Sequence, residues 1–446
     1  MHELIKDYKG HGVFTFGTDL QTTFDFVLHL PPTPDCKILT SDKTSTPDSF
    51  RVMQKNLEQR PLECSLDGKT DDGGKITCKK LLVDKINYHS DVTHGSGISI
   101  ELLPADEVRI DYPCSSSGEQ NVYLLTNLLF GGNEVIQKGQ QLDRARSNVE
   151  INDIKLIFTR LLPYDETKQR LKNSNHAIVT TEVTSTANRE VKEELDQLIW
   201  PISYLCTLGQ HCFVSPLYSA VRSGGSWKKI SYLPVKTYPP YIFDPCIDFG
   251  YQGENDFKRY LEQCYPGYKK WADTLRLDAV IEYAVSASST HVVDLSYLLL
   301  CIAFECLAEN GKEYLESIGA DFLLSSLEQN KKVLQEFMKS HMVEISDEDL
   351  QNLAKSVSYN QPSLKEKLSK IFKEFHVSFN DDDLNEFLGI RNILVHTGMF
   401  PKNMGSAHEK TQQLKDFFDK TLLTIIGYRG GRYILRSKDF KPTTLD

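Results

Sequence analysis

The segment 391–396, with the sequence Arg-Asn-Ile-Leu-Val-His, places an arginine and a histidine where apolar periodicity predicts a helix. A guanidinium can hold a phosphate group through charge-assisted hydrogen bonds, and an imidazole can transfer protons near neutral pH. The arginine, Arg391, interrupts an apolar stripe formed by Leu384, Phe387, Leu388, Leu394 and Val395. The segment therefore combines a group that binds anions with a group that acts as an acid or a base.

The helix that carries this segment has clear start and end signals. Asn380 is a good N-cap, and the three aspartates at 381–383 place negative charge at the positive end of the helix dipole. Gly398 offers a C-cap just after His396. Because consecutive residues point in different directions around a helix, dipole stabilisation explains the aspartates better than a metal site, and we expect no metal there.

Arg391 needs a partner if it lies among apolar residues. The segment Val292–Leu307 is apolar almost all round, which predicts a central core helix, and Glu305 lies deep within it. Because a buried charge is tolerable only when it is paired, we expect Glu305 to face Arg391. Two interpretations of this pair remain open. It fixes two helices to each other, or it holds the guanidinium in place for catalysis.

The chain from 261 to 446 is expected to be an all-helical bundle with short links. An arginine, a polar residue, three apolar residues and a histidine late in such a helix resemble the Arg-x4-6-His motif of the HEPN superfamily. The segment 421–428 is similar to the last helix of that bundle. The expected helices are Lys269–Ala287, Val292–Glu309, Asp321–Ser340, Ser346–Val357, Ser363–Phe375, Asn380–His396 and His408–Ile426.

The resemblance implies a metal-independent endoribonuclease without a cofactor. His396 would act as general base or acid on the 2′-hydroxyl or the leaving oxygen, and Arg391 would hold the scissile phosphate. Asn392 would orient the imidazole or bond the phosphate. The products would carry a 2′,3′-cyclic phosphate and a 5′-hydroxyl. The alternative is a non-catalytic HEPN module that binds RNA, nucleotide or a protein partner.

The layout is most similar to that of ApeA-type anti-phage HEPN proteins. This similarity implies an effector of abortive infection that cleaves tRNA or mRNA in response to a phage-derived trigger. HEPN ribonucleases are generally dimers, so a homodimer or a higher homo-oligomer is expected through the helical domain.

The spacing of Arg391 and His396 presents a geometric difficulty. Five residues at about 100° each place the two side chains about 140° apart around a regular helix. They would then not face one phosphate. Either the helix unwinds before His396, which Thr397 and Gly398 permit, or a second protomer completes the site across a two-fold axis. We favour the second explanation.

The chain from 1 to 260 is expected to be a β-rich, mostly antiparallel domain, which gives an α+β protein overall. One long helix near 189–208 should pack across the sheet, with Pro201 kinking or splitting it. The segment 68–75 is a turn rather than a phosphate-binding loop, because Lys75 and Ile76 do not match the P-loop pattern. This domain would sense the trigger or present the substrate. The expected strands are 12–16, 24–30, 80–88, 97–103, 107–112, 121–125, 154–159, 177–183 and 227–233.

Composition sets further limits. The net charge of −10 argues against a surface that coats nucleic acid. Ten cysteines without a Cys-x2-Cys pair argue against a zinc knuckle and are expected to be mostly buried, free thiols. We expect a cytoplasmic protein without a membrane span, since no secretory signal or long apolar run is found. The basic tail is either a solvated end or an RNA contact, and its cations are Arg429, Arg432, Arg436, Lys438 and Lys441.

Overall fold

The chain divides into two compact units, Met1–Glu262 and Gln263–Asp446, and the expected boundary between 260 and 261 lies close to this division. An antiparallel sheet within 8–232 precedes a helical region within 256–425, which confirms the α+β class. The computed structural model describes residues 3–16, 20–29, 37–42, 55, 63–91, 95–113, 119–138, 141–185, 192–233, 245–250, 256–318, 331–332, 334–340, 345–357, 362–401, 405–430, 432–438 and 441–444.

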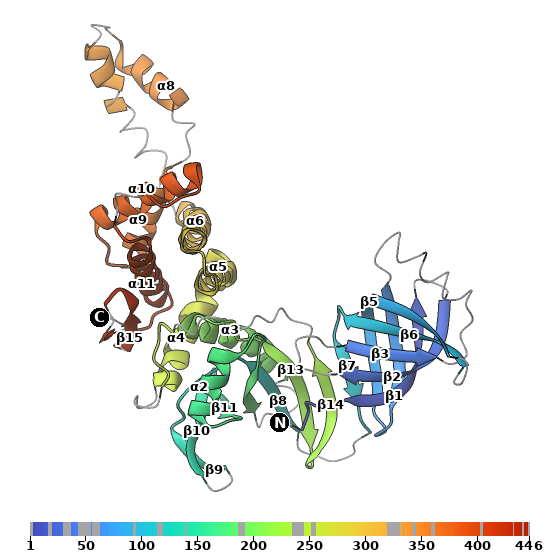
Figure 1. The fold of residues 1–446 in the computed structure, drawn as a ribbon. Coiled ribbons are helices and arrows are strands. Elements are labelled where there is room, and N and C mark those ends of the chain that lie inside the picture. Colours follow the sequence, from blue (N-terminus) through green and yellow to red (C-terminus); the bar gives the residue numbers. More distant parts are fainter. Residues whose placement is uncertain are drawn as a thin grey trace. The chain divides into compact units, whose positions relative to one another are not determined.

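Fourteen strands of the N-terminal unit form one sheet in which every described pairing is antiparallel (Figure 1). The strands are β1 (Tyr8–Phe16), β2 (Leu20–His29), β3 (Lys37–Asp42), β4 (Glu63–Thr70), β5 (Lys75–Asp91), β6 (Gly95–Pro104), β7 (Val108–Asp111), β8 (Glu119–Thr126), β9 (Glu134–Lys138), β10 (Gln141–Ile151), β11 (Ile154–Arg160), β12 (Val179–Ser185), β13 (Pro216–Ser223) and β14 (Ser226–Tyr232).

Six of these strands close into a ring, because β4 pairs with both β1 and β5 while β2, β3 and β6 complete the circuit. The strand β7 continues from β5 into a second part of the sheet, in the order β14-β13-β8-β12-β11-β10-β9. Alternate residues of β1 are buried, as period-two patterning requires. Phe14 packs edge-on against Phe24 and Phe26, with ring centroids 5.6 and 6.4 Å away.

The predicted long helix of this unit is α3 (Lys192–Gln210), which runs unbroken through Pro201. Of the two effects predicted for Pro201, splitting the helix is therefore wrong, and the kink stays a prediction. Proline removes the hydrogen bond to the carbonyl four residues earlier, and that residue, Gln197, is exposed, so water can reach its carbonyl. The predicted apolar residues of α3 that the structure describes are buried, namely Leu195, Leu198, Ile199, Ile202 and Leu205. A short helix, α2 (Tyr164–Asn173), was not predicted.

The turn expected at 68–75 is confirmed, since β4 and β5 form a hairpin across it.

Aromatic side chains pack together where the N-terminal unit reaches the start of α4. Phe257 and Tyr260, from the first turns of α4 (Asp256–Leu275), pack against Phe249 with ring centroids 5.3 and 5.2 Å away. The Tyr260 hydroxyl also donates to the carbonyl of Leu205, 2.8 Å away, so its buried polar end is satisfied.

The C-terminal unit contains the helices after α4: α5 (Leu277–Ser289), α6 (Val293–Ser317), α8 (Asp347–Val357), α9 (Leu364–Glu374), α10 (Asp381–Thr397) and α11 (Ala407–Ile425). The strands β15 (Arg432–Leu435) and β16 (Lys441–Thr444) flank a short 3-10 turn, η2 (Arg436–Lys438). The helix predicted at 321–340 falls partly outside the described residues. Within the part of the chain that is described, no helix is long and apolar enough to cross a membrane.

The single helix predicted over Lys269–Ala287 is wrong. Arg276 adopts a left-handed conformation with φ 50°, which ends α4 at Leu275 and starts α5 at Leu277. Pro266 lies inside α4, which continues beyond it to Leu275. The central helix was predicted correctly, because the buried ring of Phe304 on α6 packs among aromatic rings from other helices, those of Phe372, Phe387, Phe417 and Phe418.

Candidate functional site

The helix α10 begins and ends where the sequence predicts. The Asn380 side chain accepts a hydrogen bond from the Asp382 amide at 3.1 Å, and Gly398, with φ 70°, donates its amide to the carbonyl of Leu394 at 2.8 Å. The buried side chains are Leu384, Phe387, Ile390 and Leu394, whereas Val395 is 53% exposed. The predicted apolar stripe is therefore wrong at Val395, which lies beyond the edge of the buried face.

Arg391 and Glu305 form the predicted ion pair across α10 and α6. The Arg391 Nε donates to Glu305 Oε1 at 2.7 Å and Nη2 donates to the same oxygen at 2.5 Å. The pair lies at the edge of the bundle, with 28% of the arginine side chain and 35% of the glutamate side chain exposed. Glu305 therefore fixes one edge of a guanidinium that remains partly exposed.

Asn392 bonds the other side of the guanidinium. Its Oδ1 accepts from Arg391 Nη1 at 2.9 Å. A guanidinium has five N–H donors, and the described contacts of Arg391 use three of them. Within the described residues, two N–H groups thus remain available to an anion beside the helix.

The thiol next to this pair is inert. Cys301 lies one turn before Glu305 on α6 and is buried. Burial raises the pKa of the Cys301 thiol well above its ordinary value, and the charge of Glu305 raises it further, while Arg391 opposes the shift. The thiol therefore stays protonated at neutral pH and does not serve as a nucleophile.

His396 is exposed on α10, and among the described residues it makes no hydrogen bond or ion pair. The expected bond from Asn392 to the imidazole is thus not found in the described part, where this amide bonds Arg391 instead. The helix stays regular through Thr397, whose hydroxyl donates to the carbonyl of Ile393 at 2.8 Å. Unwinding before His396, the first of the two explanations, is therefore ruled out. Arg391 and His396 remain about 140° apart around α10.

The end of α10 is attached to the start of α6. The amide of Phe400 donates to Asp294 Oδ1 at 3.0 Å, and the ring of Tyr297 packs edge-on against that of Phe400 at 5.5 Å. The Tyr297 hydroxyl donates to the carbonyl of Phe387 at 3.4 Å. Asp294, in the first turn of α6, therefore holds the segment that follows His396.

Exposed apolar side chains lie on both helices that carry the ion pair. On α6 they are Leu295 and Ile302, 46% and 40% exposed. On α10 Val395 is 53% exposed, and Met399, just after the end of α10, is 66% exposed. Leu295 and Ile302 are seven residues apart, so they share one face of α6. Apolar side chains of this size are normally covered when several lie together.

The basic tail contains a structural arginine. Arg436 is buried, and its Nη1 donates to Asp419 Oδ2 on α11 at 2.5 Å. Asp416 accepts the backbone amides of Arg436 and Ser437 at 2.8 and 2.9 Å. Both alternatives predicted for the tail, a solvated end and an RNA contact, are therefore wrong for Arg436. Sequence reasoning missed this network, although two acids three residues apart in the apolar stripe of α11 signalled a buried cation.

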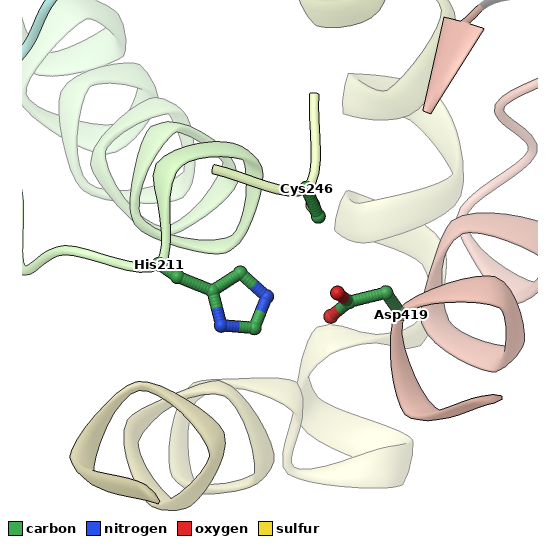
Figure 2. A group of neighbouring side chains, drawn as sticks. All are labelled: His211, Cys246 and Asp419. Atoms are coloured by element: carbon green, nitrogen blue, oxygen red, sulfur yellow. The ribbon is translucent and has the colours of Figure 1, made fainter. Parts of the chain in front are cut away.

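Cysteines in the described part of the chain are free, and seven of these eight are buried, which confirms the expectation for them. In the N-terminal unit, Cys246 donates its thiol to the carbonyl of Leu208, close to the end of α3, at 3.2 Å. Figure 2 shows the side chains of Cys246 and His211. His211, which is also buried, follows α3 in a left-handed conformation with φ 49°. Cys36 and Cys114 lie outside the described residues.

Comparisons with protein-family models, with curated proteins and with solved structures find no match for this chain. The chemistry of the site therefore follows from its own geometry. That geometry consists of an arginine held on one side by a carboxylate, an amide on its other side, and an exposed histidine on a different face of the same helix.

Proposed function

We propose that this protein is a metal-independent endoribonuclease of the HEPN type, which cleaves RNA by attack of a 2′-hydroxyl on the adjacent phosphate. The observation that supports this most is the partly exposed Arg391, which Glu305 holds in one orientation while two of its N–H groups are not used by described contacts. Such a fixed fork suits a phosphate oxygen pair.

Each proposed role matches the chemistry of its side chain. His396 removes the proton of the 2′-hydroxyl or protonates the 5′-oxygen that leaves, since an imidazole can do both near neutral pH. Arg391 stabilises the additional negative charge of the transition state. Asn392 and Glu305 keep the guanidinium in position through their hydrogen bonds. The products carry a 2′,3′-cyclic phosphate and a 5′-hydroxyl.

A second protomer supplies the histidine that faces each arginine. The regular course of α10 supports this part of the proposal, because it keeps Arg391 and His396 of one chain on different faces. The exposed apolar side chains of α6 and α10 flank the ion pair and suit a surface that another copy covers. A two-fold axis through this surface would place the His396 of one protomer toward the Arg391 of the other.

The sheet unit, in this proposal, senses a phage-derived trigger or presents the RNA, and cleavage of tRNA or mRNA stops the infected cell. The chain would act in the cytoplasm, a reducing compartment that suits its free cysteines. The net charge of −10 suits an enzyme that grips one short RNA segment rather than a long duplex.

Incubation of the purified full chain with total tRNA and mRNA in excess EDTA tests the proposal. We expect cleavage by the wild type with cyclic phosphate ends, and a rate about 10² to 10⁴ times lower for His396→Ala, as loss of a general acid or base requires. His408→Ala is the matched control, because His408 is an exposed histidine on the neighbouring α11.

The other outcomes separate the alternatives. Equal cleavage by wild type and His396→Ala would overturn the assignment of this site. If neither protein cleaves RNA, even with an extract of infected cells, but both bind it, the helical unit is a binding module. Products with 3′-hydroxyl ends would exclude attack by the 2′-hydroxyl.

A further inference from the structure

The C-terminal unit contains a cavity of about 360 Å³ between the first half of α10 and α11, away from the Arg391 guanidinium. Its walls include the rings of Phe379, Phe387 and Phe417, which offer flat apolar surfaces. This volume lies near the lower end of the range for sites that bind small molecules, and it suits a ligand with one ring system rather than a dinucleotide.

Four charged side chains line the same cavity, and two of them neutralise each other. Lys410 pairs with Glu386 at 2.8 Å. The remaining two, Asp383 and Lys420, form no ion pair with a described residue. The cavity therefore presents one open carboxylate, one open ammonium group and aromatic walls.

This combination defines what the cavity accepts. A ligand with only one charge would leave either Asp383 or Lys420 unmatched beside it. A nucleoside phosphate would place two negative charges near Asp383 and the neighbouring aspartates at 381 and 382, where the charges repel. A ligand with one cationic group, one anionic group and an aromatic ring matches the open carboxylate, the open ammonium group and the aromatic walls.

We propose that this cavity binds a small aromatic zwitterion, of which the aromatic amino acids are the simplest members. The ligand ammonium group pairs with Asp383, its carboxylate pairs with Lys420, and its ring packs among the phenylalanines. Gln413 also lines the cavity, and its side-chain amide donates to Glu409 Oε1 at 3.4 Å. The proposal is independent of RNA cleavage, since it uses none of the residues assigned to that reaction.

Titration calorimetry on the full chain with L-tryptophan, L-tyrosine and L-phenylalanine tests this inference. We expect at least one of them to bind. Its analogues without the amine or without the carboxylate, such as indole-3-propionate and tryptamine for tryptophan, should bind at least about tenfold more weakly, because each leaves one charge unmatched. AMP at the same concentrations should not compete.

Two pairs of variants assign the contacts. Lys420→Met and Asp383→Asn should each weaken binding about tenfold. The matched controls Lys373→Met on α9 and Asp381→Asn in the first turn of α10 carry the same substitutions outside the cavity lining and should bind like the wild type. Binding of no aromatic amino acid at millimolar concentration, equal binding of the analogues, tighter binding of AMP, or unchanged binding by both cavity variants would each overturn the proposal.

Discussion

The two units each contain an arginine paired with a carboxylate, and the two arginines differ in what surrounds them. Arg160 in the N-terminal unit is completely buried, and its Nη2 donates to both oxygens of Asp143 at 2.7 Å. Its Nε donates to the carbonyl of Leu162 at 2.9 Å, and its Nη1 donates to the carbonyl of Phe130. Both ends of this guanidinium are enclosed by protein.

Arg391 has the opposite surroundings. Glu305 and Asn392 hold it, but a quarter of its side chain reaches the surface, and its described hydrogen bonds use only part of its donors. A buried arginine with every donor satisfied serves the fold, whereas a partly exposed arginine that is held in position and keeps some of its donors unused is prepared for a ligand. Arg436, which is buried against Asp419, belongs with Arg160.

The largest effect that this comparison predicts is the loss of stability on breaking the buried pair. Asp143→Ala leaves the Arg160 charge uncompensated in the interior, so the free energy of unfolding of the N-terminal unit should fall by about 3–5 kcal/mol. Urea denaturation measures this. Glu166→Ala, which breaks the exposed pair with Arg170, is the control and should change it by less than about 1 kcal/mol. A similar loss of unfolding free energy in both variants would contradict the distinction between a buried and an exposed ion pair.

Arg391→Lys should lower activity strongly and stability little, whereas Asp143→Ala acts on stability. Lysine keeps the charge but lacks the planar fork, so RNA cleavage should slow by at least about 10², which corresponds to about 2.7 kcal/mol in the barrier. Urea denaturation should show a free energy of unfolding within about 1 kcal/mol of the wild type, because the pair is partly exposed. Arg170→Lys, at an exposed helical pair, serves as the control for both measurements. A large loss of stability would class Arg391 with the structural arginines.

A smaller effect should follow from Glu305→Gln, which keeps a side-chain oxygen near Arg391 but removes the negative charge. Because the guanidinium is then held less firmly, we expect cleavage about tenfold slower, or about 1.4 kcal/mol, with unchanged RNA affinity. Single-turnover kinetics separate these two quantities. Glu305→Asp should recover part of the rate, and equal rates for Glu305→Gln and the wild type would show that the pair only joins two helices.

The smallest effect concerns an exposed carboxylate of the N-terminal unit. Burial alone would raise the pKa of Asp72, but hydrogen bonds from Thr70, Lys6 and Tyr112 and the charge of Lys6 lower it below its ordinary value of 3.8. The stability that these bonds add is present above that value and is lost as the pH falls through the lower pKa of the folded state. Since Asp72 is partly exposed, Asp72→Asn should cost only a few tenths of a kcal/mol at pH 7.

Acid titration of unfolding checks this last prediction. The difference between the wild type and Asp72→Asn should shrink as the pH falls below about 4, because the wild-type carboxylate becomes neutral there. A difference that grows toward low pH would have the wrong sign and would contradict the assignment.

The Arg391–Glu305 pair could be predicted from the sequence because two charges in apolar helical stripes have few ways to be satisfied. The caps of α10 could be predicted because Asn380 and Gly398 act locally. By contrast, β10 was missed because three of its buried positions are Asp143, Ala145 and Ser147, which give little hydrophobic alternation. Asp143 is buried only because Arg160 pairs with it, and that contact depends on strand pairing.

Other features could not be predicted from the sequence, because they depend on tertiary contacts. No glycine or proline marks the break at Arg276, so the end of α4 carries no local signal. Arg436 lies in a charged tail, and only the β15–β16 hairpin and α11 place it beside Asp419. The cavity between α10 and α11 combines residues from two helices, and neither helix alone indicates it.

Mixing two inactive variants tests the central claim that Arg391 and His396 act together from different protomers. Arg391→Met and His396→Ala are each expected to lack cleavage, but a mixed dimer keeps one intact site, which pairs the arginine of one chain with the histidine of the other. After random exchange of subunits, about a quarter of the wild-type rate should return. A mixture that stays inactive, although exchange is verified, would contradict a shared site.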